Sequence, residues 1–213
     1  MSTIESMTIT RGQADRRQAI LEGAFTVFAR RGYAQACVKE VAAEAGVAKP
    51  TVYNHLNDKA TLFRQSVQAA AQVVLDERLA ALEPLKEPDD LHATLEDVGH
   101  RLLQLHTDDR SCALRRLLYA EITQFPDLID IVVENGPHRL TQALADRLAR
   151  LTLAGRLRAN DPDQAAEQLI ALLTGPLEAR SRMGTRQIDD AELHQLARAA
   201  IRTFLATFGT ADG

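Results

Sequence analysis

Segments that favour helices, separated by Pro, Gly and Asp, run through the whole chain. Ala, Leu, Arg, Glu and Gln dominate these segments, whereas alternating runs of β-branched residues are almost absent. Such segments form helices, and Pro, Gly and Asp mark where helices begin or end. Hydrophobic residues make up 46 % of the 213 residues, enough for a substantial core. The sequence therefore predicts a globular, all-α protein.

The start and stop signals predict about nine helices. Gly32 is placed to end the first helix, and Pro162 follows an N-capping Asp161 at the start of a later one. We expect a bend at Gly136–Pro137, because proline interrupts helical hydrogen bonding. The expected helices cover residues 14–31, 38–45, 49–55, 58–83, 88–106, 109–124, 126–153, 161–183 and 190 onwards.

The charge is divided unevenly along the chain. Taken alone, the net charge of −4 argues against a nucleic-acid partner, because binding to phosphates needs local positive charge. Residues 1–64, however, contain nine basic and six acidic side chains, a net charge of +3, so the remainder carries −7. A basic head on a large acidic body suits a protein that contacts DNA locally. It argues against a purely architectural nucleic-acid binder, which would be basic throughout.

Two short predicted helices flank Gly46 in this basic head. Gly46 can adopt the positive φ that a sharp turn needs, and small alanines let neighbouring helices approach closely. A longer helix before such a pair completes the pattern of a three-helix, helix-turn-helix DNA-binding domain. The residues expected to form its core are Val38, Val41, Ala42, Ala45, Val47 and Val52.

The second short helix is left with a polar face suited to DNA. Lysine and histidine can meet phosphates, tyrosine can contact a phosphate or a sugar, and threonine and asparagine can read base edges. The start of the next helix offers a further lysine. Taken singly, Tyr53 could be a half-buried packing residue and His55 a surface or capping residue. The candidate DNA contacts are Lys49, Thr51, Tyr53, Asn54, His55 and Lys59.

Over about fifty residues the chain resembles the TetR family. The residues that carry the resemblance are Gly32-Tyr33 and Val38-x-x-Val41-Ala42-x-x-Ala45-Gly46-Val47-x-Lys49-x-Thr51-Val52-Tyr53-x-His55-Leu56-x-x-Lys59-x-x-Leu62-Phe63. Further along, the chain is similar to the AefR-like C-terminal subgroup. The residues that carry this weaker similarity are Glu121-x-x-x-Phe125-Pro126-Asp127-Leu128 and Gly155-x-Leu157-x-x-x-Asp161-Pro162.

This resemblance implies a homodimer that binds a double-stranded, palindromic DNA operator, usually as a repressor, and leaves it when a small-molecule effector binds. It implies DNA-contact roles for the six candidate residues. An activator or an architectural binder is the alternative. The expected parts are a flexible N-terminal arm at 1–13, the helix-turn-helix domain at 14–60, with the connecting helix from about 58, and a ligand-binding and dimerisation domain at 61–213.

Three positions depart from the usual TetR pattern. Cys37 and Ala48 stand where Ser or Thr commonly caps a helix, and Leu56 stands where Phe is common. Losing such a cap typically costs about 1 kcal/mol. Glu40 can compensate in part by accepting a hydrogen bond from the Cys37 amide, as in half of a capping box. A reactive Cys37 that senses oxidants is conceivable, because a helix N-terminus lowers the pKa of a thiol.

Scattered polar residues on apolar faces of the body are candidates for orienting the effector. Arg115 and Tyr119 lie one helical turn apart and could bind an anionic or hydroxylated ligand. Pairing of Arg115 with Glu121 or Asp127, or simple solvation, is an equal alternative. The candidate ligand residues are His106, Arg115, Tyr119, Thr123 and Gln142.

The last helix carries an apolar stripe wider than one neighbouring helix requires. A four-helix bundle formed by two copies would bury this stripe, together with the helix that begins at Asp161. Packing inside a single protomer is the alternative. The candidate dimer-interface residues are Leu193, Leu196, Ala200 and Phe204.

Other classes of protein find little support. The chain has no glycine-rich phosphate loop, nucleophile elbow or metal-ligand spacing, so we expect no enzyme, cofactor or metal. His92, Glu96 and His100 recur every four residues, but a charged solvent face explains them better than a metal site. Cys37 and Cys112 form no pattern typical of a disulfide. No signal peptide or apolar run of about eighteen residues occurs, which predicts a cytoplasmic protein without a membrane span.

Overall fold

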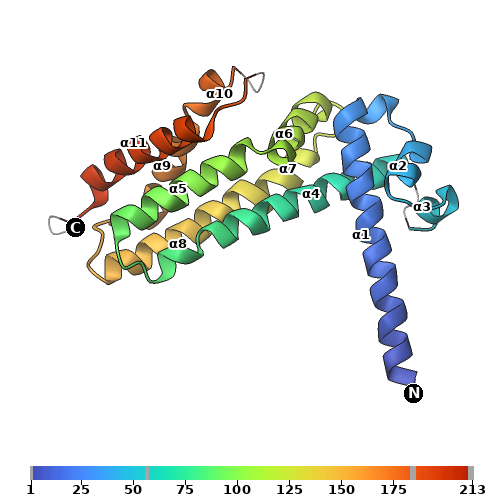
Figure 1. Ribbon diagram of the computed structural model, residues 1–213, viewed down its shortest axis with the longest axis horizontal. Coiled ribbons are helices and arrows are strands. Elements are labelled where there is room, and N and C mark those ends of the chain that lie inside the picture. Colours follow the sequence, from blue (N-terminus) through green and yellow to red (C-terminus); the bar gives the residue numbers. More distant parts are fainter. Residues whose placement is uncertain (1, 56–57, 183–185, 211–213) are drawn as a thin grey trace. The chain divides into compact units, whose positions relative to one another are not determined.

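The computed structural model describes residues 2–55, 58–182 and 186–210, and its elements follow one another as in Figure 1. Within these ranges the only β-type pairing is an isolated bridge between Leu157 and Gly209, so the all-α expectation is confirmed. The elements are α1 (Ser2–Gln35), α2 (Val38–Glu44), α3 (Lys49–His55), α4 (Lys59–Ala81), η1 (Glu83–Lys86), α5 (Leu91–Thr107), α6 (Asp109–Glu121), α7 (Leu128–Val133), η2 (Glu134–His138), α8 (Arg139–Leu153), α9 (Pro162–Thr174), α10 (Leu177–Arg180) and α11 (Asp190–Phe208).

Three helix boundaries differ from the expected ones. The arm expected at 1–13 is helical from Ser2 and continuous with α1, because this stretch has no proline and only Gly12 as a weak helix breaker. The helix expected at 161–183 is divided into α9 and α10 at Pro176, which lacks the N–H needed to continue the hydrogen-bond ladder. The helix expected at 126–153 is divided into α7 and α8 by the wider η2 turn, which contains Pro137.

The chain divides into two compact units. Unit 1 contains Met1–Gln72 and Ala113–Val132, and unit 2 contains Val73–Cys112 and Val133–Gly213. Along α4, unit 1 continues as far as Gln72, past residue 60, where the sequence predicts the end of the helix-turn-helix domain; that division into domains stays a prediction. The later segment from α6 and α7 also belongs to unit 1, because it packs on α1 and α4 there.

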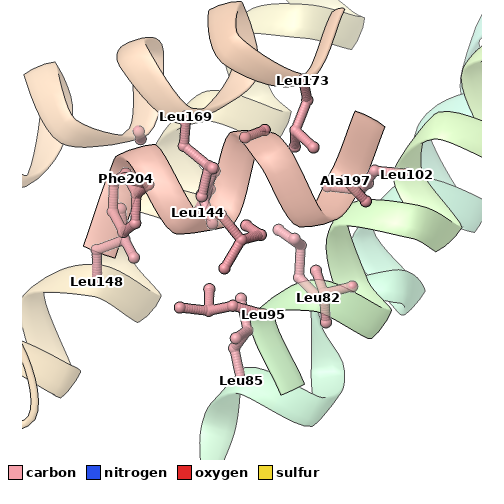
Figure 2. Packing of buried hydrophobic residues seen from close by; sticks show 14 of the residues in the cluster. Leu82, Leu85, Leu95, Leu102, Leu144, Leu148, Leu169, Leu173, Ala197 and Phe204 are labelled. Atoms are coloured by element: carbon pink, nitrogen blue, oxygen red, sulfur yellow. The ribbon is translucent and has the colours of Figure 1, made fainter. Parts of the chain in front are cut away.

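Unit 2 is built on an apolar core between four helices. α5 packs against α11, and α9 packs against both α8 and α11. Leucines of α5, α8 and α9 gather with Ala197 and Phe204 of α11 (Figure 2). The stripe expected at a dimer interface lies in this core, and its four side chains are at most 7 % exposed. This burial fits packing within the protomer, because leucines of neighbouring helices already cover the stripe. The residues concerned are Leu193, Leu196, Ala200 and Phe204.

None of the helices in the described part of the chain is both long and apolar enough to cross a membrane.

Candidate nucleic-acid interface

α2 and α3 form the expected helix-turn-helix inside unit 1. Val41 and Val52 are 1 % exposed, and Ala42 is also buried, so the apolar sides of both helices face the core. Between the helices Gly46 has a φ of 65°, and the Val47 amide donates to the Ala42 carbonyl over 2.9 Å. The predicted tight turn at Gly46 is confirmed. It leaves the opposite side of α3 to solvent.

Close approach of α1 to α2 supports this arrangement. A Cβ atom added to Gly23 of α1 would lie 3.0 Å from the Ala45 backbone nitrogen and 3.2 Å from the Ala45 side chain. Such distances are tighter than most Cβ contacts in proteins, so a larger residue at position 23 would require the Ala45 backbone to shift by a few tenths of an ångström. The small residue expected at position 45 packs against Gly23. The sequence pattern did not predict this contact.

The substitution Gly23→Val is therefore expected to lower the free energy of unfolding by about 1–3 kcal/mol, the usual cost of overpacking. Its added atoms meet the Ala45 backbone, which cannot turn aside as a flexible side chain can. Chemical denaturation measures the loss. Ala19→Val on the exposed face of α1 is the control, and it should cost less than about 1 kcal/mol through helix propensity alone. Equal losses at the two positions would contradict the close approach.

The exposed side of α3 carries most of the predicted DNA contacts. Lys49 and Asn54 are exposed, Tyr53 keeps 47 % of its surface exposed, and Thr51 is half-buried. The Lys49 Nζ atom lies 5.8 Å from the centre of the Tyr53 ring, so a cation and an aromatic ring lie on the same surface. The side chain of His55 lies outside what the structure describes. The exposed face therefore carries an ammonium group that can donate hydrogen bonds to a phosphate, together with a phenol and an amide.

Lys59 has partners within the protein. Its Nζ atom donates to the Ala34 carbonyl over 3.2 Å and lies 4.7 Å above the centre of the Tyr33 ring. These contacts tie the start of α4 to the end of α1. A phosphate contact by Lys59 stays a prediction, in which the ammonium group would share its donors between Ala34 and DNA.

Asp58, which the sequence predicts as the first residue of this helix, lies just before α4 and caps it. Its carboxylate accepts hydrogen bonds from the Thr61 amide at 2.7 Å and from the Thr61 hydroxyl at 2.9 Å. These bonds, the amide bond foremost, hold the pKa of the Asp58 carboxyl below its usual value, because they stabilise the ionised form. The start of α4 after the helix-turn-helix is therefore firmly capped.

The weak cap at Cys37 is supported as expected. Glu40 accepts a hydrogen bond from the Cys37 amide over 3.4 Å, which is the predicted half of a capping box. Arg31 lies 3.5 Å from the same carboxylate. The Cys37 thiol is exposed, and Cys112 lies in unit 2, so the two thiols belong to different units.

An aromatic cluster joins α1, α4 and the segment after α6 within unit 1. The Phe63 ring centre lies 4.9 Å from that of Phe28 and 4.9 Å from that of Phe125. Beside it, the Arg64 Nε atom lies 2.6 Å from an Asp127 carboxylate oxygen. The hydrogen bond raises the pKa of Arg64 and lowers that of Asp127. Asp127 thus pairs with Arg64. From the sequence, Arg115 was a possible partner of Asp127.

The five candidate ligand residues are divided between the units. Three of them belong to unit 1 and two to unit 2, and Tyr119 is 67 % exposed. Neither unit therefore gathers all five. Their role in binding an effector stays a prediction for Arg115, Tyr119 and Thr123 of unit 1 and for His106 and Gln142 of unit 2.

The repeat of His92, Glu96 and His100 along α5 forms two separate contacts. His92 lies 3.3 Å from Glu96, whereas His100 lies 2.9 Å from Asp190 of α11. Asp190 also accepts a hydrogen bond from Gln104, and this bond, followed by the one with His100, lowers the pKa of the Asp190 carboxyl. Among the described residues no group of three such side chains is arranged to hold a metal ion.

Comparison with known proteins identifies both halves of the chain. Residues 20–65 match the family described as bacterial regulatory proteins, tetR family, and residues 93–210 match the AefR-like transcriptional repressor, C-terminal domain. The chain is 33 % identical over 97 residues to the HTH-type transcriptional repressor BepR of Brucella suis. That alignment spans 46 % of each protein, so the chain covers about half the length of BepR.

Two longer matches extend this similarity. The chain is 27 % identical to the HTH-type transcriptional regulator TtgR of Pseudomonas putida, over 76 % of the chain and 78 % of TtgR. A crystal structure of a TetR-family regulator from Mesorhizobium loti superposes with a TM-score of 0.87. That protein is 30 % identical, and the match covers 93 % of this chain and 98 % of the other.

These matches confirm the expected family and, because its members are transcriptional regulators, the expectation that the chain is not an enzyme. The exposed polar face of α3 belongs to the part matched by the tetR family, and most of the core of unit 2 belongs to the AefR-like part. The chain is a member of the TetR family of bacterial transcriptional regulators, with an AefR-like C-terminal domain.

Proposed function

We propose that the chain is a homodimeric repressor that binds a palindromic DNA operator and is released by a small-molecule effector. Its site of action is the cytoplasm, where the DNA lies. The observation that carries the proposal is the division of α3 into a buried side at Val52 and a polar, exposed side at Lys49, Tyr53 and Asn54. A helix with one such side can enter the major groove while the other side holds it on the domain.

The chemistry of the exposed side supports roles in both affinity and sequence reading. Lys49 and Tyr53 can hold phosphates and fix the register of the helix on DNA, and neither contact carries sequence information directly. Asn54 and Thr51 can form hydrogen bonds with base edges, which are the groups that distinguish one sequence from another. His55 and Lys59 extend the proposed phosphate contacts.

The proposals of repression, dimerisation and effector release are supported by the membership of the chain in the TetR family. A palindromic operator requires two heads related by two-fold symmetry, and therefore two copies of the chain. Because the apolar sides of α9 and α11 face the core of unit 2, we propose that a second copy packs on their solvent-facing sides. Unit 2 is the proposed receptor for the effector, whose chemical class is left open.

Binding to a labelled fragment of the DNA directly upstream of the chain's own coding region tests the proposal. Wild-type protein is expected to bind with an affinity that falls steeply as salt rises. Lys49→Ala should weaken binding about uniformly across sequences and reduce the slope of log affinity against log salt by about one. Tyr53→Ala should weaken binding as well. Fluorescence anisotropy over a series of salt concentrations measures both quantities.

Arg139→Ala provides a control matched in charge. Arg139 is an exposed residue of α8 in unit 2, and its loss changes the net charge as much as the loss of Lys49. The control should bind like wild type. Equal binding by wild type, Lys49→Ala and Tyr53→Ala would show that α3 is not the reading helix.

A further inference from the structure

We propose that Glu121, Phe125 and Asp127, called here the clamp residues, are positioning residues for DNA binding. They lie far beyond the reading helix in sequence, yet they belong to the same compact unit. On this view the DNA-binding unit is discontinuous, and its geometry depends on the α6–α7 segment as well as on α1 to α4. The inference rests on the proposed DNA-binding function.

Glu121 holds the end of α1. Its Oε1 atom accepts a hydrogen bond from the Tyr33 amide at 2.8 Å, although the two residues are 88 positions apart. Tyr33 follows Gly32, whose φ of 73° and ψ of 168° interrupt the helix. An amide beyond such an interruption needs an acceptor other than the regular helical carbonyl. Glu121, the last residue of α6, supplies that acceptor.

Phe125 fills the space between the end of α1 and the start of α4. Its side chain is 4 % exposed, and its ring centre lies 4.6 Å from that of Tyr33 and 4.9 Å from that of Phe63. The Arg64 guanidinium lies 4.8 Å from the same ring centre. One side chain from the α6–α7 segment therefore touches both helices that flank the helix-turn-helix.

Asp127 fixes the first turns of α4. Both of its carboxylate oxygens accept hydrogen bonds from Arg64, from Nε at 2.6 Å and from Nη2 at 3.3 Å. A two-point contact of this kind sets orientation as well as distance. Because both side chains are more than a third exposed, the pair adds little to the stability of the fold. Its effect is therefore expected in geometry more than in stability.

The two anchored points enclose the reading helix. Tyr33 and Arg64 stand on either side of the chain segment that contains α2 and α3, so the clamp fixes both ends of that segment. Contacts with phosphates and base edges depend on the exact placement of short side chains. Releasing either anchor should therefore weaken DNA binding even where unit 1 stays folded.

The test measures DNA affinity and thermal unfolding on full-length variants, with DNA recovered by selection from a random library as the probe. Glu121→Ala and Asp127→Ala should each weaken binding about three- to tenfold, the range that the net contribution of a hydrogen-bonded contact covers. Removal of an acidic charge by itself would strengthen binding to DNA, so a simple charge effect has the opposite sign. Glu121→Gln keeps an acceptor for the Tyr33 amide and should retain most of the wild-type affinity.

Asp130→Ala is the matched control, because Asp130 is an exposed acidic residue of α7 in the same unit. It should bind DNA as well as wild type or better. The inference is overturned if Glu121→Ala and Asp127→Ala behave like this control, or if they lower only the melting temperature while the folded variants bind normally. It is also overturned if Glu121→Gln is as weak as Glu121→Ala. Wild-type protein that binds no selected DNA would instead refute the proposed function, and the positioning role with it.

Discussion

Phe204→Ala is expected to lower the free energy of unfolding by about 3–5 kcal/mol, the usual cost of removing a large buried aromatic side chain. Phe204 is 1 % exposed in the core of unit 2, where other helices of the same protomer surround it. Denaturation followed by circular dichroism measures the loss. Because the side chain packs inside the protomer, the loss should not depend on protein concentration.

The substitution Arg150→Ala gives the comparison. Arg150 is exposed on α8 of the same unit, so its replacement should change stability by no more than about 0.5 kcal/mol. A different result is expected if Phe204 lies between two protomers. Phe204→Ala would then lower the mass found by light scattering at concentrations where the wild type keeps its mass. That outcome would contradict the placement of Phe204 in the core of the protomer.

Phe63→Ala should cause a loss of similar size, about 3–5 kcal/mol, but in unit 1. Phe63 is fully buried, and its ring contacts Phe28, Tyr33 and Phe125. The chain has no tryptophan, and its three tyrosines all lie in unit 1, so tyrosine fluorescence follows this unit alone. The fluorescence transition should move to lower denaturant concentration, and DNA binding should weaken with it.

Phe63→Leu is the milder companion, because it keeps an apolar side chain of moderate size in the cluster. It should cost less than the alanine variant. Together, the substitutions of Phe204 and Phe63 also test the division of the core between the two units. A fluorescence transition that moves in Phe204→Ala but not in Phe63→Ala would contradict the division of the core described here.

The helix-turn-helix could be predicted from sequence because its determinants lie close together along the chain. The turn depends on Gly46, the buried side of α3 on Val52, and the start of α4 on the capping residue Asp58. Each of these effects acts within one or two helical turns. Local spacing therefore indicated both the elements and the exposed polar face.

Contacts between distant segments could not be predicted in the same way. An apolar stripe shows that a residue such as Phe204 will be buried, but not whether the same protomer or a second copy covers it. Likewise, Glu121 and Asp127 belong to a recognisable motif, yet nothing local indicates that their partners are the Tyr33 amide and Arg64. The contact between Gly23 and Ala45 could not be predicted for the same reason.

Selection of bound sequences from a random DNA library, with the full-length chain, tests the central claim most directly. The account predicts enrichment of an inverted repeat, with half-sites spaced by about one helical turn of DNA or a multiple of it. The enriched sequence should change or be lost with Asn54→Ala, which removes a proposed contact to a base edge, and should be kept with Arg139→Ala. Absence of any enriched sequence, or selection of the same sequence by Asn54→Ala, would contradict DNA reading by α3.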